Sequence, residues 1–197
     1  HPELDLYNPA NPHQPPYSAA FIERYRAAQV ARNRRITAWV RGKLDDLRHR
    51  GRNADEFGFV VHGTMADPRF LDPGIDPNDR KPRWCYLGEP QVVNNGPVGL
   101  ARFCTLRSWL SQWSLEDSHA DGERCTARVQ VPVLVVSNSA DDACTPSHAR
   151  RLYEAVAHPR KELAEIAGAS HYYIGQPRQV EEAVGVVARW LEAHRLT

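Results

Sequence analysis

The chain has 197 residues and a formal net charge of +1, with 42% hydrophobic and 25% charged residues. This length and composition are typical of a globular domain, or of one lobe with an insertion. A near-neutral chain lacks the overall field that attracts nucleic acids or membrane surfaces. No apolar run approaches the roughly 20 residues that a membrane span needs. We therefore expect neither a nucleic-acid nor a membrane partner.

The cysteines are spread widely, and none forms a C-x-x-C pair. They are Cys85, Cys104, Cys125 and Cys144. Zinc sites normally use close ligand pairs on a turn, so this spacing argues against a metal. Free thiols in a reducing compartment are the simpler interpretation, which indicates a cytoplasmic protein. The chain also has no glycine-rich phosphate loop, and we expect no cofactor.

The first half of the chain is predicted to be largely helical. Residues 1–17 hold five prolines and should form an extended connector. From Ala19 to about Arg50, apolar residues recur at three- and four-residue steps, which predicts one long amphipathic helix. Ser18 is placed to cap its start, and Gly51 to end it. The opposite face of this helix is basic.

Further along, the pattern becomes irregular. Residues 52–100 are rich in Pro, Gly, Asp and Asn and predict irregular loop, with short apolar pieces at 57–61 and 84–87 that leave room for one or two short strands. Residues 101–115 have an apolar stripe at helical spacing and predict an amphipathic helix.

The last third alternates strands with helices. Val131–Ser137 is a short apolar run, as expected of a strand buried on both faces of a parallel sheet. A helix over 147–156, a second strand over 162–166 and a final helix from 177 to about 194 follow. This order predicts right-handed crossovers and parallel pairing.

Each predicted strand is followed by a loop that carries a chemically useful side chain. Asp141 and Asp142 follow the first strand, and His171 follows the second. In open parallel sheets, ligands bind at the carboxyl ends of the strands. A carboxylate there can hold a histidine in one tautomer and stabilise its cationic form, so that the histidine removes a proton from a nucleophile.

These residues resemble the end of an α/β-hydrolase. The segment VPVLVVSNSADDACTPSHARRLY is similar to the acid loop of bacterial members, and ELAEIAGASHYY to the segment that carries the triad histidine. The resemblance implies an α/β fold, with a parallel sheet flanked by helices, in which Asp141 orients the general base His171. Residues 129–197 would be the C-terminal part of the core, and residues 1–128 the family's variable, largely helical cap.

Two acids compete for the orienting role. Asp141 lies at the usual offset from Pro132 of the strand, whereas Asp142 has the more usual spacing to Pro146. We favour Asp141. Both could instead be loop caps for the following helix.

The nucleophile of this family is missing. It occupies G-x-S-x-G, a tight turn between a strand and a helix, and no serine, cysteine or aspartate of the chain stands in that context. Ser170 has a glycine two residues before it, but it adjoins His171 and has Tyr172 at the second glycine position. We therefore expect the nucleophile upstream of His1, in an N-terminal half supplied by a second chain, and we expect this chain to be unstable alone.

The leading hypothesis is a serine hydrolase that cleaves an ester, amide or similar acyl bond of a small apolar substrate. The tryptophans of the cap could line its pocket, although core packing would explain them equally. One alternative keeps the fold but changes the chemistry to that of a dehalogenase, a C–C hydrolase or a non-catalytic scaffold. Another is a module that binds phosphate or nucleic acid through the basic helix 19–50.

Overall fold

In the computed structural model, residues 2–53 and 57–195 are described, and residues 54–56 of the predicted loop lie outside them. The chain divides into two units, one formed by residues 1–68 and 89–121, the other by residues 69–88 and 122–197. Segment 69–88 is thus grouped with the C-terminal unit, and the division of the chain into a cap and a core near residue 128 stays a prediction. Within the described ranges, no helix has both the length and the apolar character needed to cross a bilayer.

The long helix α1 (Ala19–His49) organises the first unit and confirms the predicted helix. The Ser18 side chain accepts a hydrogen bond from the Phe21 backbone N–H at 3.2 Å, which satisfies one of the unpaired donors of the first turn. Gly51, with φ +64°, follows the helix in the left-handed conformation that glycine tolerates best. The apolar stripe faces the unit's core.

Two short strands complete that core. β1 (Gly58–Val60) and β2 (Phe103–Thr105) pair antiparallel. The buried cluster they help to form consists of Val40, Leu44, Val61, Cys104, Leu106 and Trp109. The remaining short elements are η1 (Pro2–Leu4), η3 (Pro68–Phe70), α2 (Pro90–Asn95) and α4 (Gly122–Thr126).

The prediction of a helix over 101–115 is wrong for the first part of that range. β2 occupies its beginning, and the helical portion is split into α3 (Leu106–Ser108) and a π-helical turn, η4 (Trp109–Trp113). The reason is local. Thr105 and Ser108 form a reciprocal capping box that starts a helix at Leu106. The residues before the box are left to pair with β1. The apolar piece at 84–87 lies in a tight turn with one bridge between Cys85 and Gly88.

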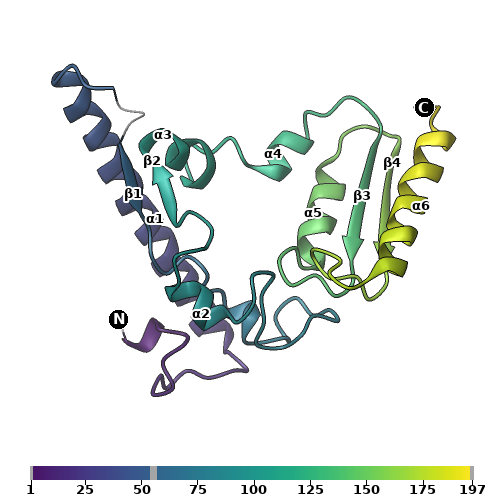
Figure 1. Ribbon diagram of the computed structural model, residues 1–197, viewed down its shortest axis with the longest axis horizontal. Helices are drawn as coiled ribbons and strands as arrows, with labels where there is room; N and C mark the ends of the chain where they lie inside the picture. Colours follow the sequence, from purple (N-terminus) through teal and green to yellow (C-terminus); the bar gives the residue numbers. More distant parts are fainter. Residues whose placement is uncertain (1, 54–56, 196–197) are drawn as a thin grey trace. The chain divides into compact units, whose positions relative to one another are not determined.

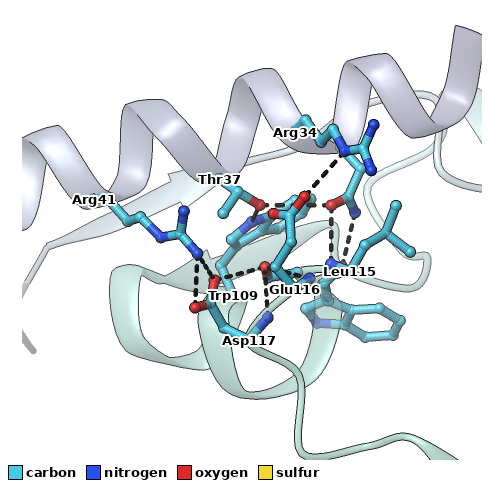
Figure 2. Close-up of polar contacts among 10 residues, drawn as sticks. Arg34, Thr37, Arg41, Trp109, Leu115, Glu116 and Asp117 are labelled. Atoms are coloured by element: carbon cyan, nitrogen blue, oxygen red, sulfur yellow. Dashed lines mark hydrogen bonds and ion pairs between the residues drawn. The ribbon is translucent and has the colours of Figure 1, made fainter.

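Polar contacts attach α1 to the segment that follows η4 (Figure 2). The Trp109 indole N–H donates to Thr37 Oγ1 at 3.0 Å, and both residues are almost fully buried. Nearer the surface, Arg41 pairs with Asp117 at 2.7 Å. These contacts satisfy polar groups in and around the apolar core, where an unpaired donor is costly.

The second unit contains the predicted strand–helix–strand–helix order (Figure 1). β3 (Val133–Asn138) and β4 (Lys161–Ile166) pair in parallel, with Val133 opposite Lys161 and Asn138 opposite Ile166. Helices α5 (Pro146–Ala155) and α6 (Pro177–Ala193) both pack on these strands. Parallel pairing is confirmed, in a sheet of two strands among the described residues.

Apolar side chains of this unit are less covered than the sequence predicts. The sequence predicts a strand buried on both faces over 131–137. In the structure, Val136 of β3 is 37% exposed, and Val131, which lies before β3, is 62% exposed. On β4, Leu163 is 41% exposed. The amphipathic helix α6 buries none of its described residues. The expectation of full burial is therefore wrong for this chain, because one pair of strands and two helices cannot cover both faces.

We predict that Thr37→Val destabilises the first unit. Valine keeps the volume of threonine but leaves the buried Trp109 indole N–H without its acceptor, at a cost of about 1–3 kcal/mol in the free energy of unfolding. Urea unfolding followed by tryptophan fluorescence measures this cost. Arg34→Ala is the control, since its ion pair with Glu116 joins two exposed side chains and should contribute at most ~0.5 kcal/mol. Equal losses in both variants would contradict the assignment.

Candidate active site

The loop after β3 holds Asp141 in one orientation. Its Oδ1 accepts hydrogen bonds from the backbone N–H groups of Ala143 and Cys144, both at 2.7 Å. The residue is only 5% exposed. Two backbone donors fix the carboxylate plane and stabilise its charged form.

His171 faces this carboxylate from the loop after β4. Its Nδ1 lies 3.1 Å from both Oδ1 and Oδ2 of Asp141. With the ring proton on Nδ1, the imidazole donates to Asp141 and keeps Nε2 as its basic atom. The histidine side chain is 28% exposed and the aspartate side chain 8%. The nearly buried acid thus orients an imidazole ring that solvent can reach.

Backbone hydrogen bonds extend the parallel pairing into the two loops and bring these residues together. Ser139 N–H donates to Ile166 O at 3.1 Å, and Ala140 N–H to Ala169 O at 3.0 Å. The Ser139 hydroxyl accepts from Gly168 N–H at 2.8 Å. Consequently the loops leave the sheet side by side.

Side chains then fix the histidine loop itself. Asn138, the last residue of β3, donates to Ser170 O and accepts from the Tyr173 hydroxyl at 2.6 Å. Gln176 accepts from both the backbone and the hydroxyl of Ser170, and donates to Gly168 O at 2.7 Å. The residues on both sides of His171 are held, which limits how far its ring can move.

Asp142 occupies a different environment from its neighbour. It is 9% exposed, and its Oδ1 has no hydrogen-bond partner among the described residues. Burial, together with the nearby charge of Asp141, raises the pKa of Asp142 above its ordinary value. The structure therefore pairs His171 with Asp141, and Asp142 is a poorly solvated carboxyl beside that pair.

Segment 69–88 contributes residues that sequence reasoning missed. Asn78 donates to the Asp141 carbonyl at 2.8 Å, and Asp79 accepts from the Ser139 hydroxyl at 2.6 Å. The Tyr86 ring centre lies 5.3 Å from that of His171, and burial raises the pKa of this phenol to about 12. Tyr86 is therefore a neutral phenol at physiological pH. A loop without periodicity gave no signal for these contacts.

Cys144 carries a thiol near Asp141 and His171. Its exposed position lies in the turn that binds Asp141. Partial desolvation and the charge of Asp141 raise the pKa of the Cys144 thiol. A nucleophilic cysteine needs a lowered pKa, so this environment does not favour Cys144 as a nucleophile.

Comparison with known proteins gives limited matches. No family model matches the chain. Two Escherichia coli proteins, both described as an uncharacterized 31.7 kDa protein in the traX-finO intergenic region, are 40% identical over 68 residues. Those residues are 34% of this chain and 24% of each relative, so the chain spans about a quarter of their length.

One solved structure, a monoacylglycerol lipase from Paleococcus ferrophilus, overlays 81% of this chain with 52% of its own. The chain thus spans about half of the lipase. The TM-score is 0.42 and the sequence identity 21%. This likeness is too weak to support an argument about activity.

The environment of Asp142 predicts that Asp142→Asn stabilises the fold by an amount that depends on pH. Because its folded pKa is raised, the protonated folded form is favoured, and that stability is lost as pH rises through the folded pKa. Asparagine cannot ionise, so the variant should gain stability at pH 7. The gain should shrink near pH 4.

Urea unfolding at both pH values measures this effect. Asp141→Asn is the matched control and should lose stability at pH 7, because its carboxylate accepts three hydrogen bonds. Loss of stability in Asp142→Asn at pH 7 would contradict the prediction.

Proposed function

We propose that this chain supplies the acid and the general base of a hydrolase that cleaves an ester, amide or similar acyl bond. One observation carries the proposal: the Asp141 carboxylate lies 3.1 Å from His171 Nδ1, at the carboxyl ends of two adjacent parallel strands. This pairing sets the tautomer that leaves Nε2 able to accept a proton. The nearly buried carboxylate would stabilise the imidazolium that forms.

The chemistry proceeds in two steps. A nucleophile hydroxyl gives its proton to His171 Nε2 as its oxygen bonds to the acyl carbon, and the histidine passes that proton to the leaving group. In the second step, water gives a proton to Nε2 and attacks the acyl-enzyme. The proton returns to the nucleophile as the acid product leaves, and Asp141 keeps its negative charge throughout.

The proposal assigns the nucleophile to a second polypeptide, which carries the G-x-S-x-G turn that the 197 residues lack. The exposed apolar surface of the C-terminal unit supports this assignment. Parallel sheets are normally covered on both faces, whereas Val136, Leu163 and Val184 are between 37% and 62% exposed. Early strands of the same sheet, packed there, would cover these side chains and bring a nucleophile to the carboxyl ends of the strands.

The substrate proposed is a small molecule with an apolar acyl group. The tryptophans expected to line its pocket differ in their surroundings. Trp109 is a core residue, 3% exposed. Trp39 is 47% exposed and lines an open cleft of about 530 Å³ in the first unit, together with Ile36, Phe59 and Val60. Of these two tryptophans, only Trp39 therefore has apolar surface that is open to a small molecule.

The competing phosphate-binding hypothesis loses support from the ion pairs of α1. Five of the nine basic residues on or just after this helix pair with carboxylates, namely Arg34, Arg41, Lys43, Arg48 and Arg50. Their charge is thereby largely balanced within the unit.

Dehalogenase or C–C hydrolase chemistry would differ from the proposal in the nucleophile and its partners, and would use the same acid–histidine pair.

We predict that activity, measured after coexpression with the nucleophile-bearing polypeptide, depends on one acid only. On a chromogenic acyl ester, His171→Ala should lower kcat by ~10⁴-fold or more, because the nucleophile then has no base. Asp141→Asn should cause a loss of similar order. Asp142→Asn is the matched control and should stay within about tenfold of the parent. Equal losses for both acids would refute the assignment of Asp141.

We also predict that the chain alone self-associates and binds a hydrophobic dye such as anilinonaphthalene sulfonate, since its apolar sheet and helix faces are open. Adding the nucleophile-bearing polypeptide should suppress the dye signal. Val184→Asp, at a 62% exposed position of α6, should weaken this pairing at least ~10-fold by placing a charge in an apolar interface.

Glu182→Ala, on the same helix, is the control and should pair as the parent does. Sedimentation velocity reports association in each case. A monodisperse, dye-silent monomer of the 197 residues would argue against the second polypeptide.

A further inference from the structure

Three different metal-binding side chains meet in the loops beyond β3 and β4. Asp141, Cys144 and His171 each offer one ligand atom, and these atoms all lie within 4.8 Å of one another. The wide spacing of the cysteines gave no sign of this set, because one cysteine, one histidine and one carboxylate come together from the loops of two strands.

The backbone holds this set in place. The Cys144 N–H donates to Asp141 Oδ1, which keeps the cysteine three residues after the acid and on the same turn. That oxygen is already engaged by two backbone donors. In contrast, Oδ2 has only His171 as a hydrogen-bond partner among the described residues. Both oxygens lie 3.1 Å from His171 Nδ1, but Oδ1 also holds the turn, so Oδ2 is the oxygen that can bind an ion.

We propose that Asp141 Oδ2, Cys144 Sγ and His171 Nδ1 bind a divalent transition-metal ion of the Zn²⁺ type, with water as the fourth ligand. Zinc bonds of about 2.0–2.3 Å in tetrahedral geometry place ligand atoms roughly 3.5 Å apart. Ligand atoms that lie within 4.8 Å of one another would have to close by about 1.3 Å at most, which the exposed cysteine and the partly exposed histidine allow. A thiolate, an imidazole and a carboxylate favour such an ion over Mg²⁺ or Ca²⁺.

Binding of the ion has a defined proton balance. The Cys144 thiol releases its proton to solvent and binds as thiolate. The imidazole proton moves from Nδ1 to Nε2, so that Nδ1 can donate its lone pair to the metal. One proton is released per ion, and the ion takes the place of the proton between His171 and Asp141.

This exchange would regulate the proposed hydrolase. With a proton on Nε2 and metal on Nδ1, His171 cannot accept a proton from a nucleophile. The metal-bound form is therefore inactive. This regulatory step rests on the proposed function, whereas the metal site itself does not.

Cobalt(II) titration of the 197-residue chain, reduced with a non-chelating phosphine, tests the site without any need for activity. Thiolate coordination gives a near-ultraviolet charge-transfer band, and tetrahedral geometry gives intense visible bands. We expect both at one equivalent, and their loss when Zn²⁺ is added. Cys144→Ser and His171→Ala should each weaken binding on the order of 100-fold.

Cys125→Ser removes the other exposed thiol and is the matched control, which should bind as the parent does. Circular dichroism of each variant identifies any loss of fold, and Cys144→Ser changes one atom at an exposed position. Absence of a thiolate band, or its persistence in Cys144→Ser, overturns the site.

In the coexpressed enzyme, Zn²⁺ should inhibit ester hydrolysis. The Cys144→Ser variant should need at least ~10-fold more Zn²⁺ for the same inhibition. Zinc binding without inhibition would instead overturn His171 as the base, so the two proposals fail by different results.

Discussion

The parallel register of β3 and β4 is the constraint on which the candidate site depends. It places Asn138 opposite Ile166, so the two strands end at the same level. Asp141 follows three residues after the first end, and His171 five residues after the second. A slip of one residue would change which loop atoms meet and would turn every strand side chain to the other face. The continued backbone bonding of Ser139 and Ala140 to the opposite loop makes such a slip costly.

Two adjacent aspartates show how environment separates chemically identical groups. Asp141 receives two backbone N–H bonds and a histidine, and these stabilise its charge. Asp142, one residue later, is buried, and its Oδ1 has no hydrogen-bond partner in the part of the chain that the structure describes; burial raises its pKa. The first is suited to orient a base. The second adds a carboxyl whose ionisation costs stability at neutral pH.

The loops after β3 and β4 carry both proposed properties, the orientation of a base and the binding of a metal ion. The turn that fixes the acid also brings a thiol close to the histidine, so the geometry that orients a base also assembles a soft metal-binding set. A proton or a metal ion between His171 and Asp141 leads to opposite states of Nε2, one basic and one protonated. In addition, β3, β4 and α6 expose apolar side chains that the rest of the unit does not cover.

The sequence by itself determined the local elements, because each depends on near neighbours. The long amphipathic helix with its Ser18 cap, the two strands and their helices, and the parallel pairing are all predictable from periodicity and order. The sequence also brought Asp141 and His171 to attention as strand-end residues, but it left Asp142 as an alternative.

Only the tertiary structure decided which aspartate contacts the histidine, since that depends on the direction of each side chain in an irregular loop. It also decided that Tyr86 and Asn78 from segment 69–88 join the site, and that the helix expected over 101–115 begins as a strand. The contacts of Tyr86 and Asn78 join residues far apart in the chain, for which no local pattern exists. The strand before Leu106 depends both on its pairing with β1 and on the local capping box of Thr105 and Ser108.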